Sequence, residues 1–324
     1  MMRANLWLRT ASRVIARVAE FRATAFYELE KQARRIDWNA WLGDGVAPEF
    51  RVTAKKSKLF HSDAIAERLL RACDPSRATL GMTRQLFIVR VHRDMFTISA
   101  DTSGELLHMR GYRQAVGKAP LRETIAAAML IASDWTGDDA LLDPMCGSGT
   151  IPIEAALIAS HTAPGLLREF AFERWPSFHQ ATWDGLRAEA LHRITPVEIS
   201  IRGSDRDAGA IEAARANAER AAISASLLFE VKAMSAVHAS DITGLIATNP
   251  PYGKRVSEGK DIRNLYAELG KLMRGKFADW RLTLLSPEDR LTAQIGIPLE
   301  RLAKTTNGGI RVSLLSSARF LHSE

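Results

Sequence analysis

The stretch LLDPMCGSGTIPIE, residues 141–154, holds the signal that decides the fold. An apolar run ends at an acid, Asp143, and a turn with two glycines leads into a second apolar run that starts at about Thr150. Glycine lets backbone and ligand approach closely, and the first N–H groups of a helix are free to bind a ligand. We therefore predict a buried strand, a ligand-binding turn at Gly147 and Gly149, and a helix that begins at Thr150.

Three kinds of nucleotide-binding turn compete for this stretch. A dinucleotide fingerprint needs a third glycine where the chain has Pro152, and a phosphate loop needs Gly-Lys where it has Pro152 and Ile153. The third pattern, Asp-x-x-x-Gly-x-Gly, is the turn that holds S-adenosylmethionine, with Asp143 placed to order the ammonium end of the methionine. A purely structural strand-to-helix turn also fits this stretch alone.

Strands and helices alternate regularly around this turn. The expected elements are helix 120–133, strand 140–144, helix 150–160, strand 197–205, helix 207–222, strand 226–233, strand 244–250, helix 261–276 and strand 281–286. Asn307-Gly308 predicts a final antiparallel hairpin. This order is typical of a Rossmann-like, doubly wound α/β sheet, which binds ligands beyond the carboxyl ends of its strands.

The first third of the chain has a different pattern. Its expected elements are two strands, at 13–21 and 85–100, and two amphipathic helices, at 25–36 and 62–73. We therefore predict a mixed α+β domain at 1–112, followed by the alternating domain at 113–324.

Charge is also uneven along the chain. The net charge is +7, and residues 1–110 carry all of it, with 19 Lys and Arg against 12 Asp and Glu. A basic module beside a neutral body suggests a polyanion partner such as RNA, although a solvated lysine face gives the same count. The candidate RNA contacts are Arg51, Lys56, Lys58, Arg110 and Arg113. On a strand, Lys56 and Lys58 would project to the same side.

Composition narrows the other possibilities. A chain of 324 residues with 46% hydrophobic content can bury a large core. Its two cysteines exclude a disulfide framework or a cysteine zinc cluster, and its eight histidines show no paired metal spacing. No apolar stretch approaches the roughly 18 residues that cross a bilayer. We expect a cytoplasmic monomer without metal.

Two further motifs follow strands of the predicted sheet. In IRGSDRDAGAIEAARANA, residues 201–218, Asp205 suits a ribose diol, because one carboxylate can accept from both hydroxyls, while Asp207 suits a helix N-cap. Both acids could instead be caps.

The second motif, TNPPYGKR at 248–255, places an amide and two rigid prolines after a strand. The Asn249 side-chain oxygen and the Pro250 carbonyl can accept the two N–H bonds of an exocyclic base amine, turning its lone pair toward a methyl donor. Tyr252 can stack on the base. The catalytic candidates are therefore Asn249, Pro250 and Tyr252. In a plain turn, Asn-Pro would serve only as punctuation.

With these motifs, the chain resembles the THUMP-domain RNA guanine-N2 methyltransferases, formerly described as N6-adenine DNA methylases. The resemblance covers nearly the whole chain and is carried by RANLWLRTASRV (3–14), DTSGELLHMRGYR (101–113), APLRETIAAAML (119–130), DPMCGSGTIPIEAALIA (143–159), APGLLREFAFERWPSF (163–178), GSDRD (203–207), TNPPYGKR (248–255) and NGGIRVSLL (307–315).

The resemblance implies a class I methyltransferase fold, an N-terminal THUMP-like domain, and S-adenosylmethionine as the cofactor. It implies that the acceptor is N2 of a guanosine in 23S ribosomal RNA or in tRNA. The residues matched to the cofactor site are Asp143, Gly147, Gly149, Thr150, Asp205 and Asn249.

Two features depart from the family pattern. Members usually begin with one further small ferredoxin-like segment, so we expect the THUMP-like domain to be N-terminally incomplete. Related enzymes often place an acid after the third strand for the adenine amine, where this chain has Met234 and Ser235. Adenine recognition is therefore left unassigned.

Two other functions fit part of the sequence. An adenine-N6 DNA methylase shares the chemistry, because Asn-Pro-Pro-Tyr orients either amine. An RNA-binding or ribosome-assembly factor with an inactive methylase domain would keep the fold alone. The intact set of Asp143, Gly147, Gly149, Asp205 and Asn249 disfavours this non-enzyme alternative.

Overall fold

The computed structural model describes residues 1–73, 83–114, 121–252 and 262–317. The chain divides into two compact units. Unit 1 comprises residues 1–107 and 168–189, and unit 2 comprises residues 108–167 and 190–324. Within the described ranges, no helix is long and apolar enough to cross a membrane.

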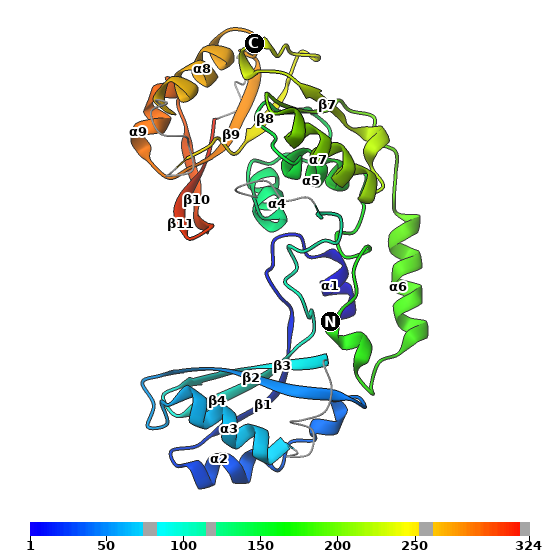
Figure 1. Ribbon diagram of the computed structural model, residues 1–324, viewed down its shortest axis with the longest axis vertical. Helices are drawn as coiled ribbons and strands as arrows, with labels where there is room; N and C mark the ends of the chain where they lie inside the picture. The colour runs from blue at the N-terminus through cyan, green and yellow to red at the C-terminus, as the bar shows by residue number, and fades with distance from the viewer. Residues whose placement is uncertain (74–82, 115–120, 253–261, 318–324) are drawn as a thin grey trace, which may run out of the picture. The chain divides into compact units, whose positions relative to one another are not determined.

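Unit 1 is built on a four-stranded sheet with the strand order β1-β4-β3-β2. Its strands are β1 (Ile15–Arg22), β2 (Val46–Lys55), β3 (Thr83–His92) and β4 (Met95–Asp101). Its helices include α1 (Met2–Trp7), α2 (Phe26–Ala33) and α3 (Ser62–Cys73). β2 and β3 are parallel, whereas β4 is antiparallel to β1 and β3. Figure 1 shows α2 and α3 side by side along this sheet, which confirms a mixed α+β unit.

Period-two burial explains the core of unit 1. Phe87, Val89 and Val91 alternate on β3 and are almost fully buried, as are Phe96 and Ile98 on β4. The segment predicted as strand 85–100 is therefore β structure, but it turns back on itself between β3 and β4. The turn residues Arg93 and Asp94 have positive φ angles, a conformation that is uncommon for residues other than glycine and that the sequence does not indicate.

Residues 168–189 belong to unit 1, whereas the predicted boundary at 112/113 places them in the second domain. Aromatic side chains hold this segment. Trp175 donates from Nε1 to Oε1 of Gln85 over 2.7 Å, and its ring contacts Trp41 edge to face. Trp183, at the start of α6 (Gln180–His192), packs edge to face against Phe172. Because these large rings are buried in unit 1, the segment belongs to its core.

Unit 2 contains a seven-stranded sheet with the order β10-β11-β9-β8-β5-β6-β7. Its strands are β5 (Ala140–Asp143), β6 (Ile201–Asp205), β7 (Leu228–Val231), β8 (Gly244–Thr248), β9 (Trp280–Ser286), β10 (Glu300–Asn307) and β11 (Ile310–Ser316). Its helices are α4 (Glu123–Ala132), α5 (Thr150–Ala159), α7 (Ala208–Arg220), α8 (Ile262–Arg274) and α9 (Asp289–Thr292).

The pairing in unit 2 confirms the predicted doubly wound sheet. Strands β5 to β9 are mutually parallel, and β11 and β10 end the sheet as an antiparallel hairpin. β5 lies between β6 and β8. The carboxyl ends of these three strands therefore meet at one edge, where sheets of this kind bind ligands.

Candidate active site

The glycine turn follows β5 directly. Gly147 and Gly149 have φ angles of 52° and 83°, which favour glycine, and α5 begins at Thr150. A Cβ atom on Gly149 would lie only 2.9 Å from Cβ of Ala214 and 3.0 Å from Cζ of Phe229. At Gly147 a Cβ atom would meet nothing within 4 Å. Gly149 therefore packs the turn against α7 and β7, while Gly147 leaves space beside the backbone.

Asp143 is a buried acid at the carboxyl end of β5. Its Oδ1 accepts hydrogen bonds from Oγ1 of Thr248 at 2.7 Å and from the backbone N–H of Met145 at 3.1 Å. Burial raises the pKa of Asp143 to about 7. A bound ammonium group would favour the ionised carboxylate, so Asp143 suits the methionine end of the proposed donor.

Asp205 connects the end of β6 to the glycine turn. Its Oδ2 accepts from the backbone N–H of Gly147, and its Oδ1 accepts from the N–H of Asp207, each at 3.0 Å. Asp207 in turn caps α7 by accepting from Gly209 and Ala210, as predicted. Each oxygen of Asp205 keeps a lone pair that could accept from a further donor. Its role toward a ribose diol stays a prediction.

Asn249 and Pro250 follow β8, next to β5. Thr248 joins the two motifs, because its hydroxyl donates to Asp143 across 105 positions of sequence. Oδ1 of Asn249 is buried and has no hydrogen-bond partner within the described part of the chain. A buried acceptor of this kind needs an explanation, and a ligand amine would supply the missing donor. Residues 253–255 of the motif lie outside the described residues.

Tyr252 is held differently from the prediction that it stacks on a base. It is only 9% exposed and belongs to the apolar core of unit 2. Its hydroxyl accepts a hydrogen bond from Nδ2 of Asn307, at the end of β10, over 2.8 Å. Little of the ring is open to a base in this conformation. Tyr252 therefore supports the loop that carries Asn249 and Pro250.

Two of the five candidate RNA contacts lie inside unit 2. Arg110 is 2% exposed, and its Nε lies 3.4 Å from Oε1 of Glu154, which is fully buried. The prediction that Arg110 contacts RNA is wrong for this conformation. If Arg110 left the pair, Glu154 would remain as an unpaired buried charge, at a cost of several kcal/mol. Glu154 had no predicted role, although an acid within the apolar helix TIPIEAALIA signals a buried partner.

Arg113 also points inward. Its Nη2 donates to Oγ1 of Thr150 at 3.0 Å, and its Nε lies 3.1 Å from Oε1 of Glu123. Its side chain is 12% exposed, so the prediction of an RNA contact is corrected here too. Arg113 instead fixes the first residue of α5, directly after the glycine turn.

The other three candidate RNA contacts lie on unit 1 and are exposed. Arg51 is on β2 and approaches Glu49 to 3.7 Å. β2 ends at Lys55, and Lys56 has a φ angle of 52°, so strand alternation does not extend from Lys56 to Lys58. The alternation that predicts a common side for these two lysines therefore does not apply, because the chain leaves the strand after Lys55.

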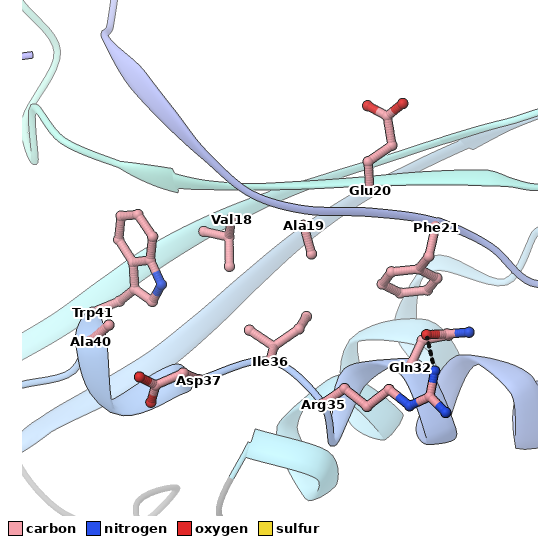
Figure 2. A pocket seen from close by; sticks show the side chains of 10 residues that line it. All are labelled: Val18, Ala19, Glu20, Phe21, Gln32, Arg35, Ile36, Asp37, Ala40 and Trp41. Atoms are coloured by element: carbon pink, nitrogen blue, oxygen red, sulfur yellow. Dashed lines mark hydrogen bonds between the residues drawn. The ribbon is translucent and has the colours of Figure 1, made fainter.

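Unit 1 also has a pocket of about 360 Å³, which the sequence did not suggest. In Figure 2, Val18 and Phe21 of β1 point toward Ile36 in the segment after α2, whereas Glu20 points to the other side of the strand. The remaining charged lining residues are Arg35 and Asp37, so the pocket has no excess of positive charge. None of its lining residues belongs to the predicted sites.

The chain is similar to known methyltransferases. The family model described as the RMKL-like methyltransferase domain matches residues 110–314. Ribosomal RNA large subunit methyltransferase K/L of Syntrophotalea carbinolica is 37% identical over 97% of this chain and 47% of its own length. The chain thus spans about half of that relative.

Two solved structures are each similar to this chain over most of its length and most of their own. A protein from Listeria monocytogenes, described as a predicted N6-adenine-specific DNA methylase, is 33% identical, with a TM-score of 0.85 over 97% of this chain and 84% of its own. The structure of SMU.472, which is complexed with SAH, is 30% identical, with a TM-score of 0.84 over 97% and 86% of the two chains.

Proposed function

We propose that this chain, which belongs to the RMKL-like methyltransferase domain family, transfers a methyl group from S-adenosylmethionine to the exocyclic N2 amine of a guanosine in structured RNA. We propose 23S ribosomal RNA as its substrate. The observation that carries the proposal is the buried, unpartnered Oδ1 of Asn249, joined through Thr248 to the buried acid Asp143.

The donor fits the residues of the glycine turn. S-adenosylmethionine supplies a methyl group on a positively charged sulfur, which makes that methyl an electrophile. Asp143 would face the ammonium group, and Asp205 would accept from the ribose hydroxyls. Gly147 leaves its side of the turn open, and Arg113 holds Thr150 at the start of α5. The relative complexed with SAH, the demethylated form of this donor, supports the assignment.

Asn249 and Pro250 would orient the acceptor amine. The lone pair of an exocyclic base amine is delocalised into the ring, so the amine is a weak nucleophile. Two acceptors, Oδ1 of Asn249 and the carbonyl oxygen of Pro250, would take both N–H bonds and turn the lone pair toward the methyl group. The proline rings limit backbone motion, and the bond between Tyr252 and Asn307 steadies the loop.

RNA is favoured over DNA by charge and by the relatives. All of the excess positive charge lies in residues 1–110, and the Syntrophotalea relative is named as a ribosomal RNA methyltransferase. We propose that unit 1 is a THUMP-like RNA-binding module. Transfer RNA is the alternative RNA substrate. The name of the Listeria relative instead favours N6 of adenine in DNA, which the same two acceptors could orient.

Product analysis of Asn249 variants tests the proposal. The chain would be incubated with a deuterated methyl donor and, in separate reactions, ribosomal RNA, tRNA or DNA, and labelled nucleosides would be identified by mass spectrometry. We expect N2-methylguanosine from ribosomal RNA. Asn249→Ala should lower turnover about 100-fold or more, because an aligning acceptor is lost, while donor affinity changes little.

Asn249→Asp is the matched control, because it keeps an oxygen acceptor and should retain far more activity than the alanine variant. Full turnover by Asn249→Ala would show that the amine is oriented by other groups. Labelled N6-methyladenine would select the DNA or RNA adenine methylase instead.

A further inference from the structure

Phe60 lies at one end of the unit 1 sheet, where several strand ends meet. β2 and β3 are parallel, and their last residues, Lys55 and His92, are paired. At the same end, Met95 begins β4 opposite Arg22, the last residue of β1. The loop that leaves β2 therefore shares this end with the turn between β3 and β4.

The Phe60 ring is exposed beside a buried anchor. Phe60 is 61% exposed, whereas its neighbour Leu59 is buried. The ring centroid of Phe60 lies 4.0 Å from that of His61, with 38° between the two planes, and His61 is also exposed. We call these two rings the Phe60 platform. The exposed ring leaves an aromatic face open to a ligand.

Positive side chains lie in the loop that carries the platform and in the adjoining turn between β3 and β4. Lys55, Lys56, Lys58 and Arg93 are all exposed, and none of them forms an ion pair within the described part of the chain. The one acid at the turn between β3 and β4, Asp94, accepts from the backbone N–H of Lys58 at 2.7 Å. The four cations are therefore free to meet an anionic ligand.

The two loops are fixed to one another. Oγ of Ser57 accepts from the backbone N–H of Asp94 at 3.0 Å and donates to the carbonyl of Lys55 at 3.0 Å. The N–H of Arg93 donates to the same carbonyl at 3.3 Å. Lys56, Arg93 and Asp94 all have φ between 52° and 63°, an unfavourable conformation for residues other than glycine, which persists where the surroundings enforce it. The backbone that carries these cations is thus fixed.

We propose that the Phe60 platform stacks on an unpaired base of the RNA substrate, with the backbone phosphates beside Lys55, Lys56, Lys58 and Arg93. Every base offers a flat face to an aromatic ring, and nearby cations follow the phosphates. The free cations distinguish this site from the pocket of Figure 2, where the charge of Arg35 is balanced by that of Asp37. This inference rests on the proposed RNA substrate and adds the unpaired nucleotide as the feature recognised by unit 1.

Binding of RNA to the full chain tests the proposal. Fluorescence anisotropy would measure the affinity for a single-stranded RNA of about ten nucleotides and for a blunt RNA duplex. Phe60→Ala should weaken binding of the single strand by roughly 5-fold to 100-fold and leave duplex binding unchanged, whereas Phe60→Trp should preserve single-strand binding.

Tyr27→Ala is the matched control. Tyr27 is also an exposed aromatic residue of unit 1, at 71%, but its hydroxyl contacts the acid Glu28. We expect no change in affinity for this variant. An equal loss in Tyr27→Ala and Phe60→Ala, or unchanged single-strand binding by Phe60→Ala, would overturn the proposal.

Two measurements separate this inference from the proposed function. If the parent methylates RNA but Phe60→Ala binds the single strand as well as the parent, only the platform is refuted. If the parent neither binds nor methylates RNA, both proposals fail. If Phe60→Ala sediments as a smaller species than the parent and binds RNA equally well, the ring mediates contact between copies of the chain. This result would also refute base stacking.

Discussion

Replacing Asp143 with asparagine should change stability and donor binding in opposite directions. Burial raises the pKa of this carboxyl from its ordinary value of 3.8 to about 7. Between about pH 4 and pH 7 the folded protein keeps a proton that the unfolded chain has released, so stability falls as the pH rises through this range. At roughly 1.4 kcal/mol per pKa unit, ionisation of buried Asp143 costs up to about 4 kcal/mol above pH 7.

The amide of the Asp143→Asn variant does not ionise and so does not carry this cost. Its oxygen can still accept from Thr248 and Met145, as Oδ1 of Asp143 does. Without donor, we therefore expect Asp143→Asn to gain stability relative to the parent as the pH rises from about 4 to 8, by as much as about 4 kcal/mol. Urea unfolding of both proteins across this pH range measures the difference.

Donor binding should show the reverse. The variant lacks the negative charge that we propose faces the ammonium group, so its affinity for S-adenosylmethionine should fall by roughly 1.5–3 kcal/mol. Thr248→Val provides a control, because losing the hydroxyl that donates to Asp143 should raise the pKa of Asp143 further and extend the fall in stability to higher pH. A stability difference between parent and Asp143→Asn that is the same at all pH values would refute the reasoning.

The remaining predictions concern the ribose and the lysines. Asp205→Ala should weaken donor binding by roughly 1.5–3 kcal/mol, because the ribose diol loses its charged acceptor, whereas Asp207→Ser keeps a helix cap and should bind normally. Calorimetry showing equal affinities for all three proteins would contradict the ribose role. Changing Lys56 and Lys58 to Glu should weaken RNA binding and make its logarithmic salt slope shallower by about 1.5. Coincident salt titrations for parent and variant would place the RNA elsewhere.

Local patterns predicted most of unit 2. The alternation of apolar runs with amphipathic runs located its parallel strands, and Asn307-Gly308 located the final hairpin. Parallel topology then implied that Asp143, Asp205 and Asn249 lie at one edge, because each follows the end of a neighbouring strand. The bond between Thr248 and Asp143 shows how near two of these ends are.

The same patterns do not predict contacts between segments that are distant in the sequence. The sequence around Arg110 suggests an RNA contact, because a single arginine in a connector gives no sign of the buried Glu154 that pairs with it. The motif likewise suggests base stacking for Tyr252, because its hydrogen-bond partner Asn307 is 55 positions away in the sequence. The turn at Arg93 and Asp94 lacks the glycine that marks most turns with positive φ, so residues 85–100 carry no visible break.

The return of residues 168–189 to unit 1 has a consequence for dividing the chain. A fragment that begins at residue 113 would keep this segment but lose the sheet that buries it. Trp175 would lose Gln85 and Trp41, and the fragment would expose aromatic surface that invites aggregation. Unit 1 cannot be transplanted as residues 1–107 either, because its core would lack these rings. The two units are interleaved in sequence, so shuffling or fusion experiments must carry both segments of unit 1 together.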